Sequence, residues 1–292
     1  MSGHTTFRIG GPAELFVRPE DEESLVALVR GAREEGLPLF VLGGGANLLV
    51  GDKGIRGIVL DSSGLRGVAD APRAGGEAGR ELVAGAGLSM DELCLEALCR
   101  GLGGLEDFAG MPGTVGGAAY MNARCYDREM SQVIAWARSL APDGSVRVRA
   151  PDPAEWEYKR SPFQPGGAAA GDIVLAAAFR LAPADPAAVA ATMRARRADR
   201  EAKGHYRLPS AGSVFKNDRR VGRPSGKLLD ELGLRGRRLG GAMVSEWHAN
   251  IFVNSGGATA ADMRALIELA QREAREKLGV ELEPEVLMVG QF

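Results

Sequence analysis

The feature that most constrains the fold is a run of three glycines, Gly43 to Gly45, directly after the short apolar segment 39–42. A strand-like segment at 15–17 and an amphipathic helix pattern over 21–36 precede it. This order predicts a β-α-β opening that ends in a glycine turn. Three glycines leave backbone amides uncovered for a phosphate, although a tight turn between two strands explains them equally well.

A second glycine-rich stretch spans residues 110–123 and contains Pro112 and the small residues Ala118 and Ala119. Its backbone amides could hold a cofactor pyrophosphate. Neither stretch is a dinucleotide fingerprint, because Leu48 stands where G-x-G-x-x-G needs its third glycine. No Walker lysine follows the first stretch either. Each loop is therefore a candidate phosphate site whose ligand the pattern alone does not identify.

Composition excludes several classes of protein. A chain of 292 residues with 45% hydrophobic content has room for about two domains. A net charge of -2 argues against a protein that mainly binds nucleic acid. No secretory signal and no membrane-spanning apolar run is visible, and three cysteines without a C-x-x-C pair predict reduced thiols and no metal site. We expect a soluble cytoplasmic protein without a membrane or nucleic-acid partner, its oligomeric state open.

The rest of the chain alternates strand and helix patterns. A hairpin is predicted over 133–148, around the turn signal at 142–144. The other predicted elements are a final strand of the first region at 173–181, a connector helix at 186–203, helices at 225–234 and 260–277, and a closing strand at 280–290.

Ser213 is the most interesting candidate for chemistry. It follows Gly212, which lets another molecule approach the backbone closely, and Lys216 and Asn217 add a cation and an amide. From spacing alone, a Gly-Ser turn entering a strand is the favoured interpretation.

Residues 209–217 resemble the catalytic-serine motif of UDP-N-acetylenolpyruvoylglucosamine reductases, which are flavoenzymes of peptidoglycan precursor synthesis. Residues 6–13 resemble the opening of that family, and 43–49 and 110–122 resemble its two cofactor loops. The segment 282–286 resembles its closing Leu-Glu-Pro-Glu-Val motif. The resemblance covers nearly the whole chain in consistent order.

The resemblance implies an α+β fold with a vanillyl-alcohol-oxidase (PCMH-type) FAD-binding domain followed by a smaller α+β substrate-binding domain. The implied boundaries are 1–182 for the FAD region, with lobes near 1–60 and 61–182, then 183–204 for the connector and 205–292 for the substrate domain. FAD is expected to bind non-covalently, since neither loop contains Cys or His. The implied cofactor-binding residues are Gly43, Gly44, Gly45, Ala46, Asn47, Gly110, Pro112, Gly113, Thr114, Gly116 and Gly117.

The implied reaction begins with reduction of FAD by NADPH. Hydride then passes to C3 of UDP-N-acetylglucosamine enolpyruvate, Ser213 protonates C2, and UDP-N-acetylmuramate forms. Glu285 matches the family's catalytic glutamate. The family's catalytic arginine is in register with Lys159, and Arg160 follows it, so which cation serves stays open. The implied substrate-binding residues are Tyr158, Lys216, Asn217, His248 and Asn250.

The chain departs from the family in two loop positions, because Arg124 and Asp127 stand where glycines are expected. For His248, a structural histidine bonded to the backbone is preferred over a general base. Two other classes stay open. Another FAD-dependent oxidase or dehydrogenase of this fold would share the glycine loops but would not need Ser213 and Glu285 together, and a noncatalytic nucleotide-binding protein would need neither.

Overall fold

The computed structural model describes residues 1–72 and 80–292. Its contacts divide the chain into two compact units. Unit 1 comprises Met1–Leu15, Gly45–Arg56 and Asp199–Phe292, and unit 2 comprises Phe16–Gly44 and Gly57–Ala198. The chain therefore passes from one unit to the other inside the first glycine loop, between Gly44 and Gly45. The domain boundaries expected from the sequence stay a prediction.

The predicted β-α-β opening is confirmed. It consists of β1 (Ala13–Val17), α1 (Glu22–Glu34) and β2 (Leu39–Leu42), and β2 pairs in parallel with β4 (Ile55–Asp61). Asp21 begins α1 because its carboxylate accepts the Ser24 amide at 2.8 Å, which satisfies one of the free donors of the first turn. The three strands have the order β1-β4-β2.

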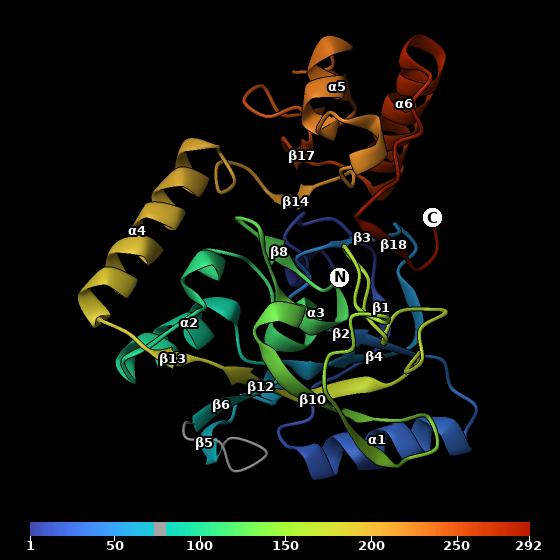
Figure 1. Ribbon diagram of the computed structural model, residues 1–292. Helices are drawn as coiled ribbons and strands as arrows, with labels where there is room; N and C mark the ends of the chain where they lie inside the picture. Colours follow the sequence, from blue (N-terminus) through green and yellow to red (C-terminus); the bar gives the residue numbers. More distant parts are fainter. Residues whose placement is uncertain (73–79) are drawn as a thin grey trace. The chain divides into compact units, whose positions relative to one another are not determined.

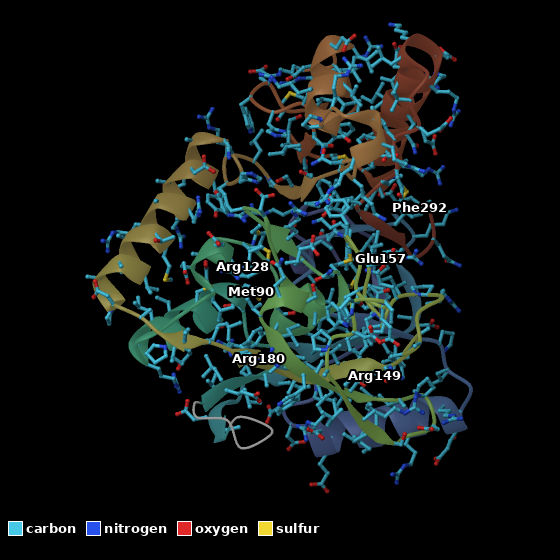
Figure 2. All side chains as sticks on the ribbon, viewed as in Figure 1. Met90, Arg128, Arg149, Glu157, Arg180 and Phe292 are labelled. Carbon is cyan, nitrogen blue, oxygen red and sulfur yellow. The ribbon has the colours of Figure 1, made fainter. Side chains whose placement is uncertain are left out.

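An antiparallel five-stranded sheet forms the body of unit 2. Its strands are β5 (Val68–Pro72), β6 (Arg80–Gly85), β10 (Ile134–Leu140), β11 (Val146–Arg149) and β12 (Ile173–Arg180), in the order β11-β10-β12-β6-β5. The predicted hairpin is the β10–β11 pair. Figure 1 shows α2 (Met90–Cys99) and α3 (Val115–Tyr120) beside this sheet, where α3 contacts β12 and β6. Their core includes Phe108, Phe179 and Met90, which is labelled in Figure 2.

Short elements complete unit 2. They are β7 (Leu102–Gly103) with β13 (Ala182–Pro183), and the hairpin of β8 (Arg124–Cys125) and β9 (Arg128–Glu129). The connector helix predicted at 186–203 is α4 (Pro186–Ala202), which begins in unit 2 and ends in unit 1.

In the described part, no helix is long and apolar enough to cross a membrane.

Unit 1 is built on an antiparallel sheet with the order β14-β17-β16-β15. The strands are β14 (Ser210–Ser213), β15 (Arg238–Leu239), β16 (Ala242–Val244) and β17 (Ile251–Asn254), and the helices are α5 (Ser225–Glu231) and α6 (Ala260–Leu278). The fully buried rings of Phe215 and Phe252 meet edge to face at 5.9 Å in its core. Phe7 and Leu49 join this core from the N-terminal segments.

Single-turn 3-10 helices lie at Ser2–His4, Ser62–Gly64, Glu106–Phe108, Met130–Gln132 and Arg219–Val221.

The closing strand predicted at 280–290 is wrong for most of its length. Only β18 (Leu287–Val289) is a strand, and it pairs in parallel with β3 (Leu48–Val50). Pro284 has no amide to donate to a ladder, which disfavours a regular strand through this position. The acidic residues Glu281, Glu283 and Glu285 therefore precede the strand, and they do not alternate along it.

Candidate active site

Gly43 and Gly44, the part of the first glycine loop that belongs to unit 2, pack directly against the second glycine loop. A Cβ atom on Gly44 would lie 2.7 Å from Gly113 Cα, and one on Gly43 would lie 2.8 Å from Thr114 Oγ1. A Cβ on Gly116 would lie 2.8 Å from Ala86 Cβ. Since real Cβ contacts are not this short, only glycine permits this packing. The loops thus present backbone rather than side chains, which fits a cofactor held through its pyrophosphate.

The start of α2 holds the second loop in place. Met90 donates its amide to the Gly113 carbonyl at 3.1 Å, and Asp91 accepts the Gly110 amide at 2.6 Å. Gly110 and Gly113 have φ values of 75° and 115°, in the region that favours glycine. Thr114 then caps α3 by accepting the Gly117 amide. The predicted loop residues, Pro112 included, are therefore on one rigidly braced turn.

The second half of the first loop belongs to unit 1. Gly45 has a φ of 61° and packs so closely on His4 that a Cβ would lie 2.0 Å from its carbonyl oxygen. After Ala46, Asn47 donates its side-chain amide to the Glu285 carbonyl at 2.9 Å. The Asn47 carbonyl in turn accepts the Leu287 amide at 3.0 Å. A predicted cofactor residue and the predicted catalytic glutamate are thereby brought together in unit 1.

Ser213 ends β14 opposite Ile251 of β17. The register is irregular between Ser210 and Ser213, and Gly212 there has a φ of 72°. The left-handed residue breaks the regular alternation of the strand, as in a β-bulge, and re-aims the side chain that follows it. Ser213 is half-buried and, among the described residues, its hydroxyl makes no hydrogen bond. The local geometry is thus a strand with a bulge rather than a simple Gly-Ser turn.

Glu285 is anchored next to Ser213 by the backbone. Its amide donates to the Val214 carbonyl at 2.7 Å, and the Lys216 amide donates to the Glu283 carbonyl at 2.9 Å. Lys216 also forms an ion pair with Glu283, with Nζ and Oε1 2.6 Å apart. The segment 283–285 therefore lies along 214–216, although the two are far apart in the sequence.

Asn250 is a brace of the Ser213 strand. It is only 2% exposed, its Oδ1 accepts the Phe215 amide at 3.0 Å, and its Nδ2 donates to the Phe215 carbonyl at 2.9 Å. Both ends of the amide are thus used inside the protein. These contacts give Asn250 a bracing role, because a buried amide needs hydrogen-bond partners, and the substrate contact expected for it from the sequence stays a prediction.

His248 and Asn217 also bond to the backbone. His248 Nδ1 accepts the Asn250 amide at 3.2 Å, and Asn217 Oδ1 accepts the Ser225 amide at 2.9 Å at the start of α5. Burial lowers the pKa of His248, so the neutral imidazole is favoured. A neutral ring that accepts a backbone amide agrees with the structural histidine preferred from the sequence.

The candidate cations lie in a loop of unit 2. Lys159 is half-buried and has a φ of 59°, whereas Arg160 has a side chain that is 60% exposed and lies 3.8 Å from Glu157. The loop is bound to the C-terminal end of α3, because Ser161 Oγ donates to the Tyr120 carbonyl at 2.6 Å. The helix that begins at the second glycine loop therefore ends at the loop that carries Lys159.

Sequence reasoning missed the contacts of Arg124, which was noted only as a departure from the family. Its guanidinium lies over the ring of Tyr158, 5.7 Å from the centroid, and pairs with Glu129 at 3.0 Å. No local pattern signals this contact, since 34 positions separate the arginine from the tyrosine. Among residues 1–72 and 80–292, no group of three or more His, Cys, Asp or Glu side chains is arranged to hold a metal ion.

Comparison with known proteins identifies the class of protein to which this chain belongs. Residues 13–149 match a family described as FAD binding domain, and residues 204–289 match the C-terminal domain of UDP-N-acetylenolpyruvoylglucosamine reductase. Together with the glycine cradle, these matches define an FAD-binding oxidoreductase.

The particular family follows from full-length relatives. The UDP-N-acetylenolpyruvoylglucosamine reductases of Treponema denticola and Rubrobacter xylanophilus are 39% and 43% identical, each over 99% of this chain and over 91% and 93% of their own lengths. The crystal structure of the Thermus caldophilus reductase matches with a TM-score of 0.77 and 33% identity, over 98% of this chain and 96% of that one. The chain belongs to the UDP-N-acetylenolpyruvoylglucosamine reductase family. The predicted family, fold class and enzyme activity are confirmed.

The Gly44 packing predicts how flavin binding responds to a single methyl group. Gly44→Ala should greatly reduce the FAD bound per chain, because the new Cβ would displace the Gly113 backbone. Gly31→Ala is the matched control, since a Cβ at that helical position meets nothing within 4 Å. Flavin absorbance relative to protein absorbance, measured after gel filtration, checks this. Equal flavin content in both variants would contradict a role for the Gly44–Gly113 packing in binding FAD.

His205 predicts that the stability of the protein depends on pH. Burial, with smaller contributions from the charges of Arg200 and His248, lowers the pKa of His205 to about 4. The unfolded chain takes up this proton near pH 6.5, so stability should rise with pH between about 4 and 6.5 and fall on acidification through that range. His205→Gln should flatten this dependence, measured as urea midpoints at pH 5 and pH 7. The control is His4→Gln, which changes an exposed histidine and should leave the pH dependence of the urea midpoint unaltered. If His205→Gln shows the same pH dependence as the wild type, His205 is not its source.

Proposed function

We propose that the chain catalyses NADPH-dependent reduction of UDP-N-acetylglucosamine enolpyruvate to UDP-N-acetylmuramate, a step of peptidoglycan precursor synthesis. The observation that carries the assignment of roles is the 2.7 Å bond from the Glu285 amide to the Val214 carbonyl. It supports a shared role for Ser213 and Glu285, because it holds the two matching family positions on adjoining stretches of backbone.

When bound, FAD would supply the hydride that reduction of the enolpyruvyl group at C3 requires, with NADPH as the source of that hydride. The residues that would hold it are the glycines of both loops, through their close backbone packing. The chain's own residues must do the rest. They must orient the substrate, stabilise the charge that develops on its carboxylate, and deliver one proton to C2.

Ser213 is the proton donor in this scheme. Hydride addition at C3 leaves an enolate-like carbanion at C2, which a positioned hydroxyl can protonate. The Ser213 hydroxyl suits this task because no other described residue binds it, and the strand beneath is braced by Asn250. Glu285 acts beside it on the developing charge.

We assign the family's catalytic cation to Lys159 rather than Arg160. Arg160 is largely exposed and lies near Glu157, so solvent and a neighbouring carboxylate screen its charge. Lys159 is half-buried, and the backbone around it is tied down by Gln164, whose Nε2 donates to the Lys159 carbonyl at 3.1 Å. A partly desolvated cation stabilises a developing carboxylate charge better than an exposed one.

The remaining candidate substrate residues are divided between the two units. Tyr158 lies next to Lys159 and contributes substrate contact, and Lys216 and Asn217 follow Ser213 on the other unit. Asn250 and His248 stabilise the backbone around the site.

The three cysteines are free thiols, which fits a reducing compartment, so the cytoplasm is the proposed site of action.

The role of Ser213 predicts a split between the two half-reactions. Ser213→Ala should bind FAD and be reduced by NADPH at the normal rate, yet reoxidise with the enolpyruvyl substrate about 10²–10⁴-fold more slowly, the usual effect of losing a general acid. Ser213→Cys should retain more activity, because a thiol can still donate. Rapid mixing of pre-reduced enzyme with substrate measures this step.

Ser210→Ala, on the same strand, is the control for structural damage and should reoxidise normally. Wild-type reoxidation and normal product from Ser213→Ala would show that Ser213 is only a strand residue.

The assignment of the cation predicts unequal effects at neighbouring positions. Lys159→Gln should slow reoxidation by about 10²–10³-fold, as expected for losing one group that stabilises developing charge. Arg160→Gln should change it less than about threefold, because an exposed ion pair contributes little. The same rapid-mixing experiment measures both, and the reverse order of effects would transfer the role to Arg160.

A further inference from the structure

Two residues that stand where the resemblance led us to expect glycines, Arg124 and Asp127, interact with each other. Arg124 and Asp127 belong to the β8–β9 hairpin, and their side chains form an ion pair across its turn. Tyr126 and Asp127 make this two-residue turn with φ values of 46° and 68°. Such a turn normally uses Asn-Gly or Asp-Gly, because glycine adopts a positive φ without a steric cost. At position 127 the ion pair with Arg124 offsets the conformational cost of a non-glycine residue.

The hairpin is fixed to the body of unit 2. The hydroxyl of Tyr126 donates to the Arg196 carbonyl at 3.1 Å, and the Arg196 guanidinium lies 4.2 Å from the centre of the Tyr126 ring. Arg196 is itself bound to Asp107 at 2.9 Å. Arg124 therefore extends from a base that α4 and the segment at Asp107 hold in place.

From this base, two contacts reach the loop that carries Lys159. The Arg124 guanidinium covers the Tyr158 ring, and Asn122 Nδ2 donates both to Glu129 Oε2 at 3.2 Å and to the Glu157 carbonyl at 2.8 Å. Glu129 also accepts from Arg124, so one carboxylate links both contacts. The side chains of Arg124 and Glu129 are only 22% and 17% exposed, which strengthens these interactions relative to surface pairs.

We propose that Arg124 is a positioning residue for the reaction, acting through Tyr158. Two carboxylates already bind its guanidinium, so it serves to hold the tyrosine ring rather than to bind the substrate carboxylate. The ring is next to Lys159, whose flexible stem has no planar fork to set its own direction. The inference rests on the proposed function, in which Tyr158 contacts substrate and Lys159 supplies the catalytic cation.

The test is a double-mutant cycle on reoxidation of pre-reduced enzyme by UDP-N-acetylglucosamine enolpyruvate. Arg124→Gln should slow reoxidation or raise the half-saturating substrate concentration by about three- to thirtyfold, the range for a partly desolvated cation–π contact. Flavin content and the rate of reduction by NADPH should stay within about twofold, as for any change confined to the substrate step. Arg124→Lys should restore part of the loss, because a cation remains over the ring.

Tyr158→Leu removes the ring through which Arg124 acts. In that background Arg124→Gln should change reoxidation less than about twofold, since coupled residues are not additive. The matched control is Arg128→Gln, which changes an arginine of the same hairpin, labelled in Figure 2, and should behave as wild type.

The outcomes separate the two levels of the inference. Arg124 would be merely structural if Arg124→Gln slowed reoxidation equally in the wild-type and Tyr158→Leu backgrounds, or if it slowed flavin reduction as much as reoxidation. Either result would overturn the role of Arg124 and leave the proposed function standing. If Tyr158→Leu and Lys159→Gln both leave reoxidation unchanged, the proposed function of this loop has failed, and the role of Arg124 fails with it.

Discussion

The site in unit 1 depends on a backbone pairing between two distant segments, 214–216 and 283–285. The Glu285 amide bonds to the Val214 carbonyl, and the Lys216 amide bonds to the Glu283 carbonyl. Pro284 cannot donate to a longer ladder, and the Lys216–Glu283 ion pair adds to these few bonds. Asn47 then joins through the Glu285 carbonyl. Because backbone atoms make these bonds, they fix the register of Glu285 beside Ser213 regardless of which side chains surround it.

In unit 2 the corresponding constraint is steric. The closeness of Gly44 to Gly113 and of Gly116 to Ala86 leaves no room for a Cβ atom, so the loops meet as bare backbone. The short helix α3 carries this arrangement onward. It spans six residues, or about 9 Å, and its far end receives Ser161 and Gln164 at the Tyr120 carbonyl. The loop of Lys159 is thereby placed at a set distance from the glycine cradle.

Three residues differ from those that the resemblance led us to expect, namely Arg124, Asp127 and Lys159. A lysine at 159 lacks the fork of an arginine, and a guanidinium at 124 lies over the neighbouring tyrosine. Arg124 in turn is paired with Asp127, which occupies a backbone conformation that glycine would adopt more easily. Arg124 and Asp127 thus belong to one connected set of contacts with Tyr158, the residue that precedes Lys159.

Much of the fold was predictable from local pattern. The β-α-β opening, the β10–β11 hairpin, α4 and α6 follow from hydrophobic periodicity and from turn and cap residues, which act over a few positions. The closing strand was predicted too long, because alternation of acids suggested a strand where Pro284 prevents one. Asn250 was expected to contact substrate, which stays a prediction, and its motif carries no sign that its amide bonds to the Phe215 backbone.

The sequence by itself determined the family, and it identified the two glycine loops, Ser213, Glu285 and the Lys159–Arg160 pair as candidates. These are properties of short motifs whose residue types are tied to their chemistry. Only the tertiary structure decided that Glu285 lies along the Ser213 strand, that Arg160 is exposed whereas Lys159 is half-buried, and that Arg124 covers Tyr158. Each of these depends on contacts between segments distant in the chain, and no local propensity or spacing encodes which distant residues will meet.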